Sequence, residues 1–100
     1  MEIFHDTTRR RFIVNKDGCL AYTAYTVHDG GLDIRHTVVP EVIKGNGIAG
    51  ALVKAAYDYA LEQGLKPLAT CSYAVVWLKR HPEYHGEPSA DYLGEGSCGL

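Results

Sequence analysis

The sequence has no excess of charge of one sign and no long hydrophobic run. Its ten lysine and arginine residues against twelve aspartate and glutamate residues give a formal net charge of −2, which leaves no electrostatic footprint for nucleic acid. The one basic cluster in the sequence, Arg9-Arg10-Arg11, is more typical of a solvated strand edge than of a phosphate-backbone contact. No apolar run approaches the roughly 20 residues that cross a bilayer. The sequence therefore predicts a protein that binds neither nucleic acid nor membrane.

Cysteine is scarce, and the N-terminus resembles no export signal. The three cysteines are odd in number and lack metal-type spacing, so the sequence supports neither a disulfide framework nor a zinc site. Residues 1–6 lack the basic and apolar regions of a secretory signal. We therefore expect a protein of the reducing cytoplasm without a bound metal. A chain of 100 residues, 46% of them hydrophobic, is sufficient for one globular domain.

Short β-type runs separated by turn signals fill the first forty residues. Residues 11–15 and residues 19–27 are joined by the turn signal Lys16-Asp17-Gly18, and Asp29-Gly30-Gly31 precedes an alternating run over residues 32–39. The alternation predicts that one face of this last run carries Leu32, Ile34, His36 and Val38. The pattern indicates an antiparallel meander of three strands, which Pro40 ends.

The hydrophobic period becomes helical after Gly47. Residues 47–62 carry one apolar stripe, and Gly64 is placed to end the helix. Residues 67–73 then read as a fourth strand and residues 75–80 as a short second helix. The sequence thus predicts an α+β fold over residues 1–84, with a mixed, mostly antiparallel sheet. Gly, Pro, Ser and Glu dominate after residue 84, so we expect residues 85–100 to form a flexible tail.

The segment between the third strand and the long helix is rich in glycine. It reads Gly45-Asn46-Gly47-Ile48-Ala49-Gly50. A glycine loop that leads into a helix N-terminus presents unpaired backbone N–H groups and the positive end of the helix dipole. Phosphate is the usual ligand of such a site. The alternative is that these glycines only permit a turn and a close helix–sheet contact.

This segment also satisfies the dinucleotide pattern G-x-G-x-x-G, but its context argues against a dinucleotide site. The preceding strands form a meander rather than a parallel βαβ unit, and residues 40–44 make the connection longer than that motif allows. No acidic residue ends the following strand, where a ribose hydroxyl would be held. A P-loop is excluded because the sequence has no Gly-Lys-Ser/Thr.

The order of elements resembles that of the GNAT acyl-CoA-dependent N-acetyltransferases. Their signature Q/R-x-x-G-x-G/A aligns with Val42-Ile43-Lys44-Gly45-Asn46-Gly47, which keeps both glycines and departs at Val42. The resemblance is to small, stand-alone GNAT-like proteins and covers about residues 11–84. It rests on three further segments: His36-Thr37-Val38-Val39-Pro40, Cys71-Ser72-Tyr73 and Arg80-His81-Pro82-Glu83-Tyr84.

This resemblance implies acetyl-CoA as co-substrate. The pyrophosphate would lie on the N–H groups of the loop and first helical turn, contributed by Lys44, Gly45, Asn46, Gly47, Ile48 and Ala49. The pantetheine arm would pair with the strand edge at Val38 and Val39 in the manner of an added strand. In such folds this strand separates from the next, and the thioester lies in the wedge between them.

The resemblance also places His36 and Cys71 near the reacting carbon and offers Tyr73 as a third candidate catalytic residue. His36 is a candidate general base, because imidazole titrates near working pH; alternatively it is a buried packing residue. Cys71 either protonates the CoA thiolate or accepts the acetyl group itself, unless it serves only as a small hydrophobe. Tyr73 is a candidate proton donor to the leaving group, or simply an aromatic residue of the cleft.

The sequence therefore predicts an N-acetyltransferase that moves an acetyl group from acetyl-CoA to an amine. The acceptor is left open between a small molecule, a polyamine and a protein amine. A non-catalytic acyl-CoA binder or sensor would keep the same loop and strand edge, with His36 and Cys71 used for packing. A third alternative is an interaction module whose outer sheet face is anchored by Phe12, Tyr22 and Tyr25.

Overall fold

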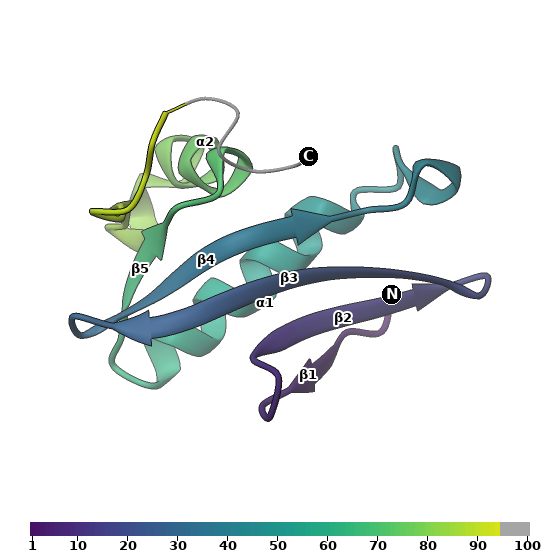
Figure 1. Cartoon of the computed structure of the whole chain (residues 1–100), viewed down its shortest axis with the longest axis horizontal. Helices are drawn as coiled ribbons and strands as arrows, with labels where there is room; N and C mark the ends of the chain where they lie inside the picture. Colours follow the sequence, from purple (N-terminus) through teal and green to yellow (C-terminus); the bar gives the residue numbers. More distant parts are fainter. Residues whose placement is uncertain (95–100) are drawn as a thin grey trace.

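The structure, a computed structural model, describes residues 1–94 and contains one mixed sheet with helices on one side (Figure 1). The sheet has six strands in the order β1-β2-β3-β4-β5-β6. In chain order the elements are β1 (Phe4–Asp6), β2 (Arg11–Lys16), β3 (Cys19–His28), β4 (Gly31–Val38), the 3-10 turn η1 (Glu41–Ile43), α1 (Ile48–Glu62), β5 (Lys66–Ala69), α2 (Ser72–Arg80), the 3-10 turn η2 (Pro82–Tyr84) and β6 (Glu87–Pro88).

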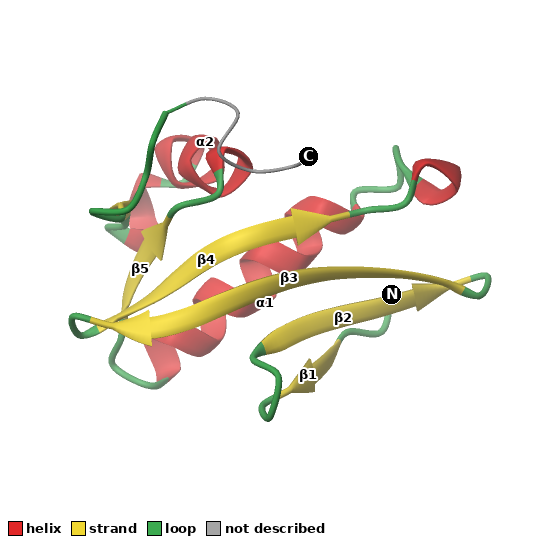
Figure 2. Cartoon of the chain, viewed as in Figure 1, coloured by secondary structure: helices red, strands yellow, loops and turns green. Residues whose placement is uncertain are grey.

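The sheet changes from antiparallel to parallel at β4. Strands β1 to β4 pair in antiparallel fashion, whereas β4–β5 and β5–β6 are parallel pairs joined through α1 and α2. Both crossovers run in the same direction along the strand order, so their common handedness places both helices on one face of the sheet (Figure 2). The rings of Tyr57 in α1 and Trp77 in α2 lie 5.7 Å apart on that face. The predicted α+β class with a mixed, mostly antiparallel sheet is confirmed.

The hydrophobic core lies between α1 and the strands it crosses. Alternate residues of β2, β3 and β4 point toward α1, and α1 packs against them with a stripe of apolar residues at helical spacing. The hydroxyl of Tyr57, completely buried, donates a 2.6 Å hydrogen bond to the carbonyl of Leu68 and so ties α1 to β5. Among the buried residues of this core are Phe12, Val14, Ala21, Leu32, Ile34, Ile48, Leu52, Val53, Ala56 and Ala60.

Strand β4 does not keep the alternation that the sequence predicts. Tyr25 pairs with Ile34 and Ala24 with His36, so Arg35 is one extra residue in the strand. Such a β-bulge reverses the faces of all later side chains. Ile34 and Thr37 are therefore buried, while His36 is exposed. The prediction that His36 and Val38 share a face with Ile34 was wrong, because the hydrophobic pattern does not reveal a single inserted residue.

The junction of β5 and α2 also differs from the prediction. Strand β5 ends at Ala69, and Ser72 and Tyr73 already belong to the first turn of α2. The N–H groups of Thr70 and Cys71 both donate to the carbonyl of Ile34, at 2.9 and 3.0 Å. This shared acceptor ends the ladder, so the strand predicted over residues 67–73 is shorter and the helix longer.

The two outer strands, β1 and β6, have no clear signal in the sequence. The predicted tail over residues 85–100 instead contributes β6, which pairs with β5. The N–H of Ser89 donates a 2.7 Å hydrogen bond to the carbonyl of Ala69, and Lys66 forms an ion pair with Glu87. The described part of this segment is therefore bound to the sheet; the rest of the predicted tail, residues 95–100, lies outside the described residues.

Candidate active site

The glycine loop before α1 has a backbone that only glycine adopts without strain. Gly45 and Gly47 have φ values of +86° and +71°, in the left-handed region that L side chains rarely occupy. The side chain of Asn46 donates from Nδ2 to the carbonyl of Ile43 at 2.8 Å, which closes the loop on itself. The side chain of Asn46 therefore stabilises the loop, and its backbone leads into α1.

The N-terminus of α1 has no side-chain cap. Gly47 is its N-cap residue, without a capping side-chain hydrogen bond, and the N–H of Ala51 donates to the carbonyl of Gly47 at 3.1 Å. The N–H groups of Ile48, Ala49 and Gly50 precede this bond and have no acceptor one turn back in the helix. They and the positive end of the helix dipole thus face the space in front of the helix.

Lys44 differs from the other predicted loop residues. Its N–H donates to the carbonyl of Glu41 at 3.2 Å, so this group is already used within η1. Its ammonium lies 3.1 Å from the Glu41 carboxylate, with both side chains largely exposed. Lys44 can therefore contribute a mobile positive charge at the rim, since an exposed pair of this kind holds its partners weakly.

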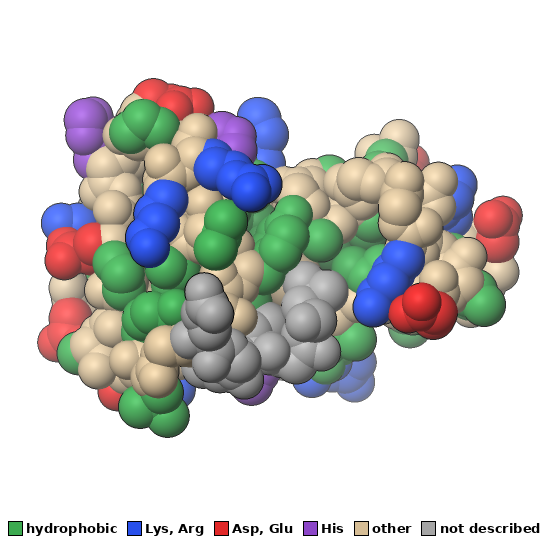
Figure 3. Space-filling view, turned by 90° about the horizontal axis from the view of Figure 1, so that it is seen from above, with side chains coloured by type: hydrophobic (Ala, Val, Ile, Leu, Met, Phe, Trp, Pro, Cys, Tyr) green, Lys and Arg blue, Asp and Glu red, His purple; other side chains and the backbone are tan. Residues whose placement is uncertain are grey.

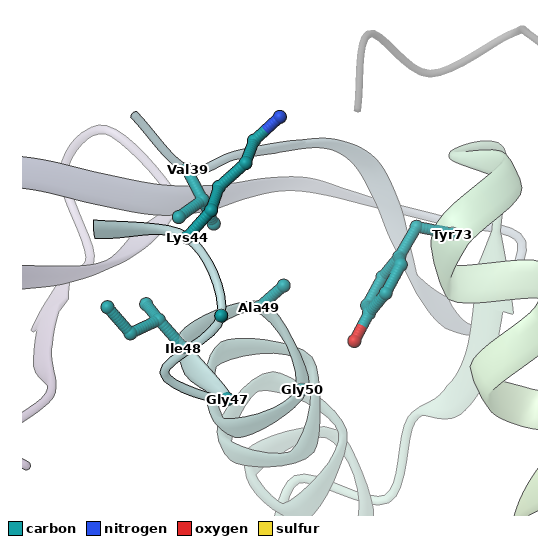
Figure 4. A pocket seen from close by; sticks show the side chains of 8 residues that line it. Val39, Lys44, Gly47, Ile48, Ala49, Gly50 and Tyr73 are labelled. Atoms are coloured by element: carbon teal, nitrogen blue, oxygen red, sulfur yellow. The ribbon is translucent and has the colours of Figure 1, made fainter. Parts of the chain in front are cut away.

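A pocket of about 240 Å³ opens in front of these N–H groups (Figure 4). Its far side is formed by Tyr73 in the first turn of α2, whose ring points toward the start of α1. A Cβ at Gly50 would lie 3.4 Å from the Tyr73 hydroxyl, so the two helices approach closely here. The pocket is lined by Val39, Lys44, Gly45, Gly47, Ile48, Ala49, Gly50 and Tyr73.

Beside this pocket β4 and β5 part from each other. Their parallel pairing covers Gly31 to Ile34 of β4, whereas β4 itself continues to Val38. We refer to the gap that begins after Ile34 and Ala69 as the β4–β5 split. Viewed from above, hydrophobic side chains gather in the hollow between the two ends of the molecule, with Lys and Arg side chains around it (Figure 3). The strand edge beyond this gap leads to Val38 and Val39, where the resemblance implies the pantetheine arm.

The structure does not bring His36 and Cys71 together. Cys71 is completely buried, and its Sγ lies 3.7 Å from Oγ1 of Thr37. We call the side of the sheet that α1 and α2 cover the helix face and the other side the open face. Thr37 and His36 are neighbours in β4 on opposite faces, so His36 lies on the open face while Cys71 lies on the helix face. The exposure of His36 rules out the alternative of a buried packing histidine.

The sulfur of Cys71 is disulfide-bonded in the structure, which the odd number of cysteines did not predict. A thiol at this position is therefore available only after reduction. Tyr73, by contrast, keeps its proton. Burial raises the pKa of its hydroxyl above the ordinary value of 10.0, partly opposed by Arg80, so the group stays protonated at neutral pH.

A charged cluster that the sequence analysis missed lies on the open face at the start of the split. Arg35, the bulge residue, bonds through Nη1 to the carboxylates of Asp33 and Asp91 at 3.0 and 2.7 Å. The Thr70 hydroxyl lies 2.9 and 3.0 Å from the two oxygens of Asp33. The alternating charges Asp33 and Arg35 in β4 were a visible signal, but Asp91 is 56 residues from Arg35 in the chain.

The chain belongs to the family of GCN5-related N-acetyltransferases. The model of that family matches residues 11–86, which span the meander, the glycine loop, α1 and α2.

Relatives named Protein NATD1 match most of the chain. That of Xenopus tropicalis is 39% identical over 85 residues, which cover 82% of this chain and 78% of the relative. That of Homo sapiens is 36% identical, covering 82% of this chain and 75% of the relative. A solution NMR structure of a GCN5-like protein from Staphylococcus aureus superimposes with a TM-score of 0.67 at 28% identity, covering 95% of this chain and 92% of that one. The fold and the family are thereby settled.

Neither helix in the described part of the chain has the length and apolar character needed to cross a bilayer.

Proposed function

We propose that this protein binds acetyl-CoA at the glycine loop and transfers its acetyl group to an amine. The observation that carries the proposal is the uncapped N-terminus of α1, which opens into a pocket beside the β4–β5 split. Membership of the GCN5-related family supports it, because members of that family typically use acyl-CoA donors.

The residues around the pocket fit a diphosphate followed by an extended amide chain. The N–H groups from Gly45 to Ala49 would hold the diphosphate, with the Lys44 ammonium adding charge at the rim; Gly45, Gly47, Ile48 and Ala49 line the pocket. The backbone at Val38, the last residue of β4, and at Val39, which follows it, would pair with the pantetheine amides. Val39 is 8% exposed and lines the pocket, so it offers an apolar wall to the pantetheine methylenes.

Transfer through the split divides the chemistry between the two faces of β4. The donor enters from the helix face, and the amine approaches from the open face, where His36 is exposed. His36 accepts the proton that the amine loses as its nitrogen bonds to the carbonyl carbon. Tyr73 donates its proton to the CoA sulfur as the carbon–sulfur bond breaks, and solvent then restores both residues to their starting protonation states.

Cys71 keeps two possible roles once it is reduced. It donates the proton to the CoA sulfur in place of Tyr73, or its thiolate accepts the acetyl group and passes it to the amine. The acceptor amine belongs to a small molecule, a polyamine or a protein. The exposed position of His36 suits an amine on a large or extended acceptor.

A second candidate function is a non-catalytic acyl-CoA binder. His36 lies apart from Cys71, and Cys71 is disulfide-bonded. Both observations favour a binder, because binding needs neither a His36–Cys71 pair nor a free thiol. Binder and enzyme share the glycine loop, and they differ in whether acetyl groups are consumed.

Calorimetry in the presence of a reductant tests the binding step. Pantetheine and 4′-phosphopantetheine differ only in one phosphate of the diphosphate, so we expect pantetheine to bind about 10- to 100-fold more weakly than 4′-phosphopantetheine, the range expected for losing charge-assisted hydrogen bonds. Equal affinities, or no heat with CoA, would remove the proposal.

The chemical step is tested by assaying acetyl transfer to spermidine and to a lysine-containing peptide. His36→Gln should lower kcat by about 100-fold or more, as expected for a lost general base. His85→Asn is the matched control. His85 is exposed and lies beyond the C-terminal end of α2, away from the pocket at its N-terminal end. Its φ of +54° is tolerated by asparagine. Binding of CoA without turnover by the wild-type protein would favour the binder. Mass spectrometry of the reduced protein after incubation with acetyl-CoA separates the two roles of Cys71.

A further inference from the structure

The charged cluster on the open face joins three parts of the chain at the point where β4 and β5 part. Arg35 lies in β4, Thr70 follows β5, and Asp91 follows β6. The Nη1 atom of Arg35 lies 3.0 Å from Asp33 Oδ2, 3.3 Å from Thr70 Oγ1 and 2.7 Å from Asp91 Oδ2. We refer to Asp33, Arg35, Thr70 and Asp91 as the Arg35 clamp.

The centre of the Arg35 clamp is the carboxylate of Asp33, which is 0% exposed. A buried carboxylate is tolerated only when its oxygens are paired and hydrogen-bonded. Here Arg35 and the Thr70 hydroxyl supply those bonds, and His28 adds a third through Nε2 at 2.8 Å. The buried charge therefore requires that Arg35 stay where it is.

One alternative use of this cluster is a cation site. Oxygen or nitrogen atoms of His28, Asp33 and Asp91 lie within 4.8 Å of one another. The Arg35 guanidinium, however, bonds both carboxylates directly. Its positive charge already does what a metal ion would do there, so the cluster is a closed ion pair network.

The position of Arg35 in β4 links the Arg35 clamp to the orientation of His36. Arg35 is the extra residue of the β-bulge, and His36 comes directly after it. An inserted residue can move along a strand unless contacts fix it, and a move to a position after His36 would turn His36 to the other face. The clamp fixes the insertion at position 35 with three hydrogen bonds.

We propose that Arg35 is a positioning residue, which holds His36 on the open face and sets the start of the β4–β5 split. The proposal rests on the proposed function for its kinetic consequence, but its structural consequence is independent of it. Arg35 acts through the strand and through Thr70, and it need not contact either substrate.

The structural test uses NMR on the full chain. His36 and Ala24 are paired across β3 and β4, so the wild-type protein should show a contact between the His36 ring protons and the Ala24 methyl group. In Arg35→Gln this contact should weaken or vanish. In Arg35→Lys, which keeps the charge but makes a single point contact, it should be partly restored.

The kinetic test compares kcat with KM in the same variants. Arg35→Gln should lower kcat by about 10- to 100-fold, the cost of misplacing a reacting group by about 1 Å. The KM for acetyl-CoA should stay within about twofold, because the glycine loop is untouched. A rise in KM at constant kcat would overturn the proposal.

Lys66→Gln is the matched control. It removes one positive charge and the ion pair to Glu87, which also ties β5 to the C-terminal segment, but it leaves the bulge intact. Both the NMR contact and kcat should match the wild type. If Arg35→Gln fails to fold, Asp91→Asn replaces it, because Asp91 is half exposed and its loss leaves Asp33 paired.

The outcomes separate the two proposals. A folded Arg35→Gln protein that keeps the His36–Ala24 contact and its kcat overturns the positioning role, as does an unchanged Asp91→Asn protein where that variant is used. A wild-type protein that transfers no acetyl group overturns the proposed function instead, and the NMR contact still decides whether Arg35 positions His36.

Discussion

The two faces of β4 at the β4–β5 split are built from different kinds of interaction. The helix face presents backbone N–H groups, small residues and the Tyr73 ring, and lacks an ion pair among its described residues apart from the Lys44–Glu41 rim pair. The open face presents the exposed His36 and the Arg35 clamp, in which a buried carboxylate is balanced by charged neighbours. The shape of a pocket formed by backbone groups depends on the conformation of the chain. The stability of a cluster of charges depends on each charge keeping its partner. Changes on the first should alter donor affinity, and changes on the second should alter stability and rate.

The largest expected effect is on stability, from Asp33→Ala. This change removes hydrogen bonds from Arg35, Thr70 and His28 to a buried carboxylate. Because Arg35 and His28 keep access to water, we expect a loss of about 3 kcal/mol in the free energy of unfolding, the upper range for bonds to a charged group. Urea denaturation measures it.

Asp58→Ala is the control for Asp33→Ala. Asp58 pairs with Lys54 on α1 and also accepts a 2.6 Å hydrogen bond from the Tyr84 hydroxyl. Because Asp58 is half exposed, we expect its loss to cost about 1–2 kcal/mol, less than at Asp33. Equal losses in the two variants would mean that burial at Asp33 carries no special weight.

Gly47→Val tests the helix face. Valine at a φ of +71° is strained, at a cost of about 1–3 kcal/mol, and relief of that strain would turn the N–H groups of the loop away from the pocket. We expect CoA binding, measured by calorimetry, to be lost or strongly weakened.

Gly18→Val separates strain from binding. Gly18 has a φ of +81° in the turn between β2 and β3, and a side chain there meets no other atom within 4 Å. It should lose similar stability while keeping the wild-type affinity for CoA. If Gly47→Val also keeps that affinity, the glycine loop does not hold the diphosphate.

Tyr73→Phe removes only the hydroxyl that points into the pocket. We expect kcat to fall by about tenfold, less than the full worth of a general acid, because water or reduced Cys71 can replace it. Calorimetry should give an unchanged CoA affinity. Tyr22→Phe, on the open face, should leave both quantities as they are; an unaltered kcat in Tyr73→Phe would dismiss Tyr73 as the acid.

The smallest effects are pH-dependent and have opposite signs at two histidines of the same sheet. Hydrogen bonds to Asp33 and Asp29 raise the pKa of His28 above its ordinary 6.5. The resulting stability is fully present below pH 6.5 and is lost as the pH rises through the folded-state pKa. The stability difference between wild type and His28→Asn should therefore shrink as the pH rises above 6.5 and through the raised pKa of His28.

His5 should behave in the reverse way. Its ring stacks on Phe12 at 4.0 Å, and desolvation there lowers its pKa below 6.5, partly opposed by Asp6. The neutral ring is favoured, so stability is intact above pH 6.5 and falls as the pH drops from there through the folded-state pKa. His5→Phe should remove this loss in acid denaturation profiles. A parallel pH dependence in the His5 and His28 variants would contradict the contrast.

Much of the fold could be predicted from local patterns. The turn glycines, the alternation in β2 and β3, and the helical stripe of α1 are short-range signals, and the glycine loop is a local one as well. Strand β6 could not be predicted, because its two residues acquire their structure only by pairing with β5.

The site was predictable where it depends on backbone and unpredictable where it depends on register. The pocket is lined by Val39, Gly45, Gly47 and Tyr73 among others, and their roles toward a donor stay a prediction. The face of His36 depends on a single inserted residue, and the Arg35 clamp depends on Asp91 returning from the far end of the chain. Such long-range contacts leave no periodic trace in a single sequence.

The inserted residue also governs how β4 should be aligned with other chains. A chain lacking position 35 would have a regular strand and would still present the counterparts of His36 and Val38 to solvent. A chain of equal length with a straight strand would turn those same side chains inward. Gaps in this strand therefore belong opposite Arg35, since a gap placed as late as Thr37 would equate an interior residue with the outward-facing His36.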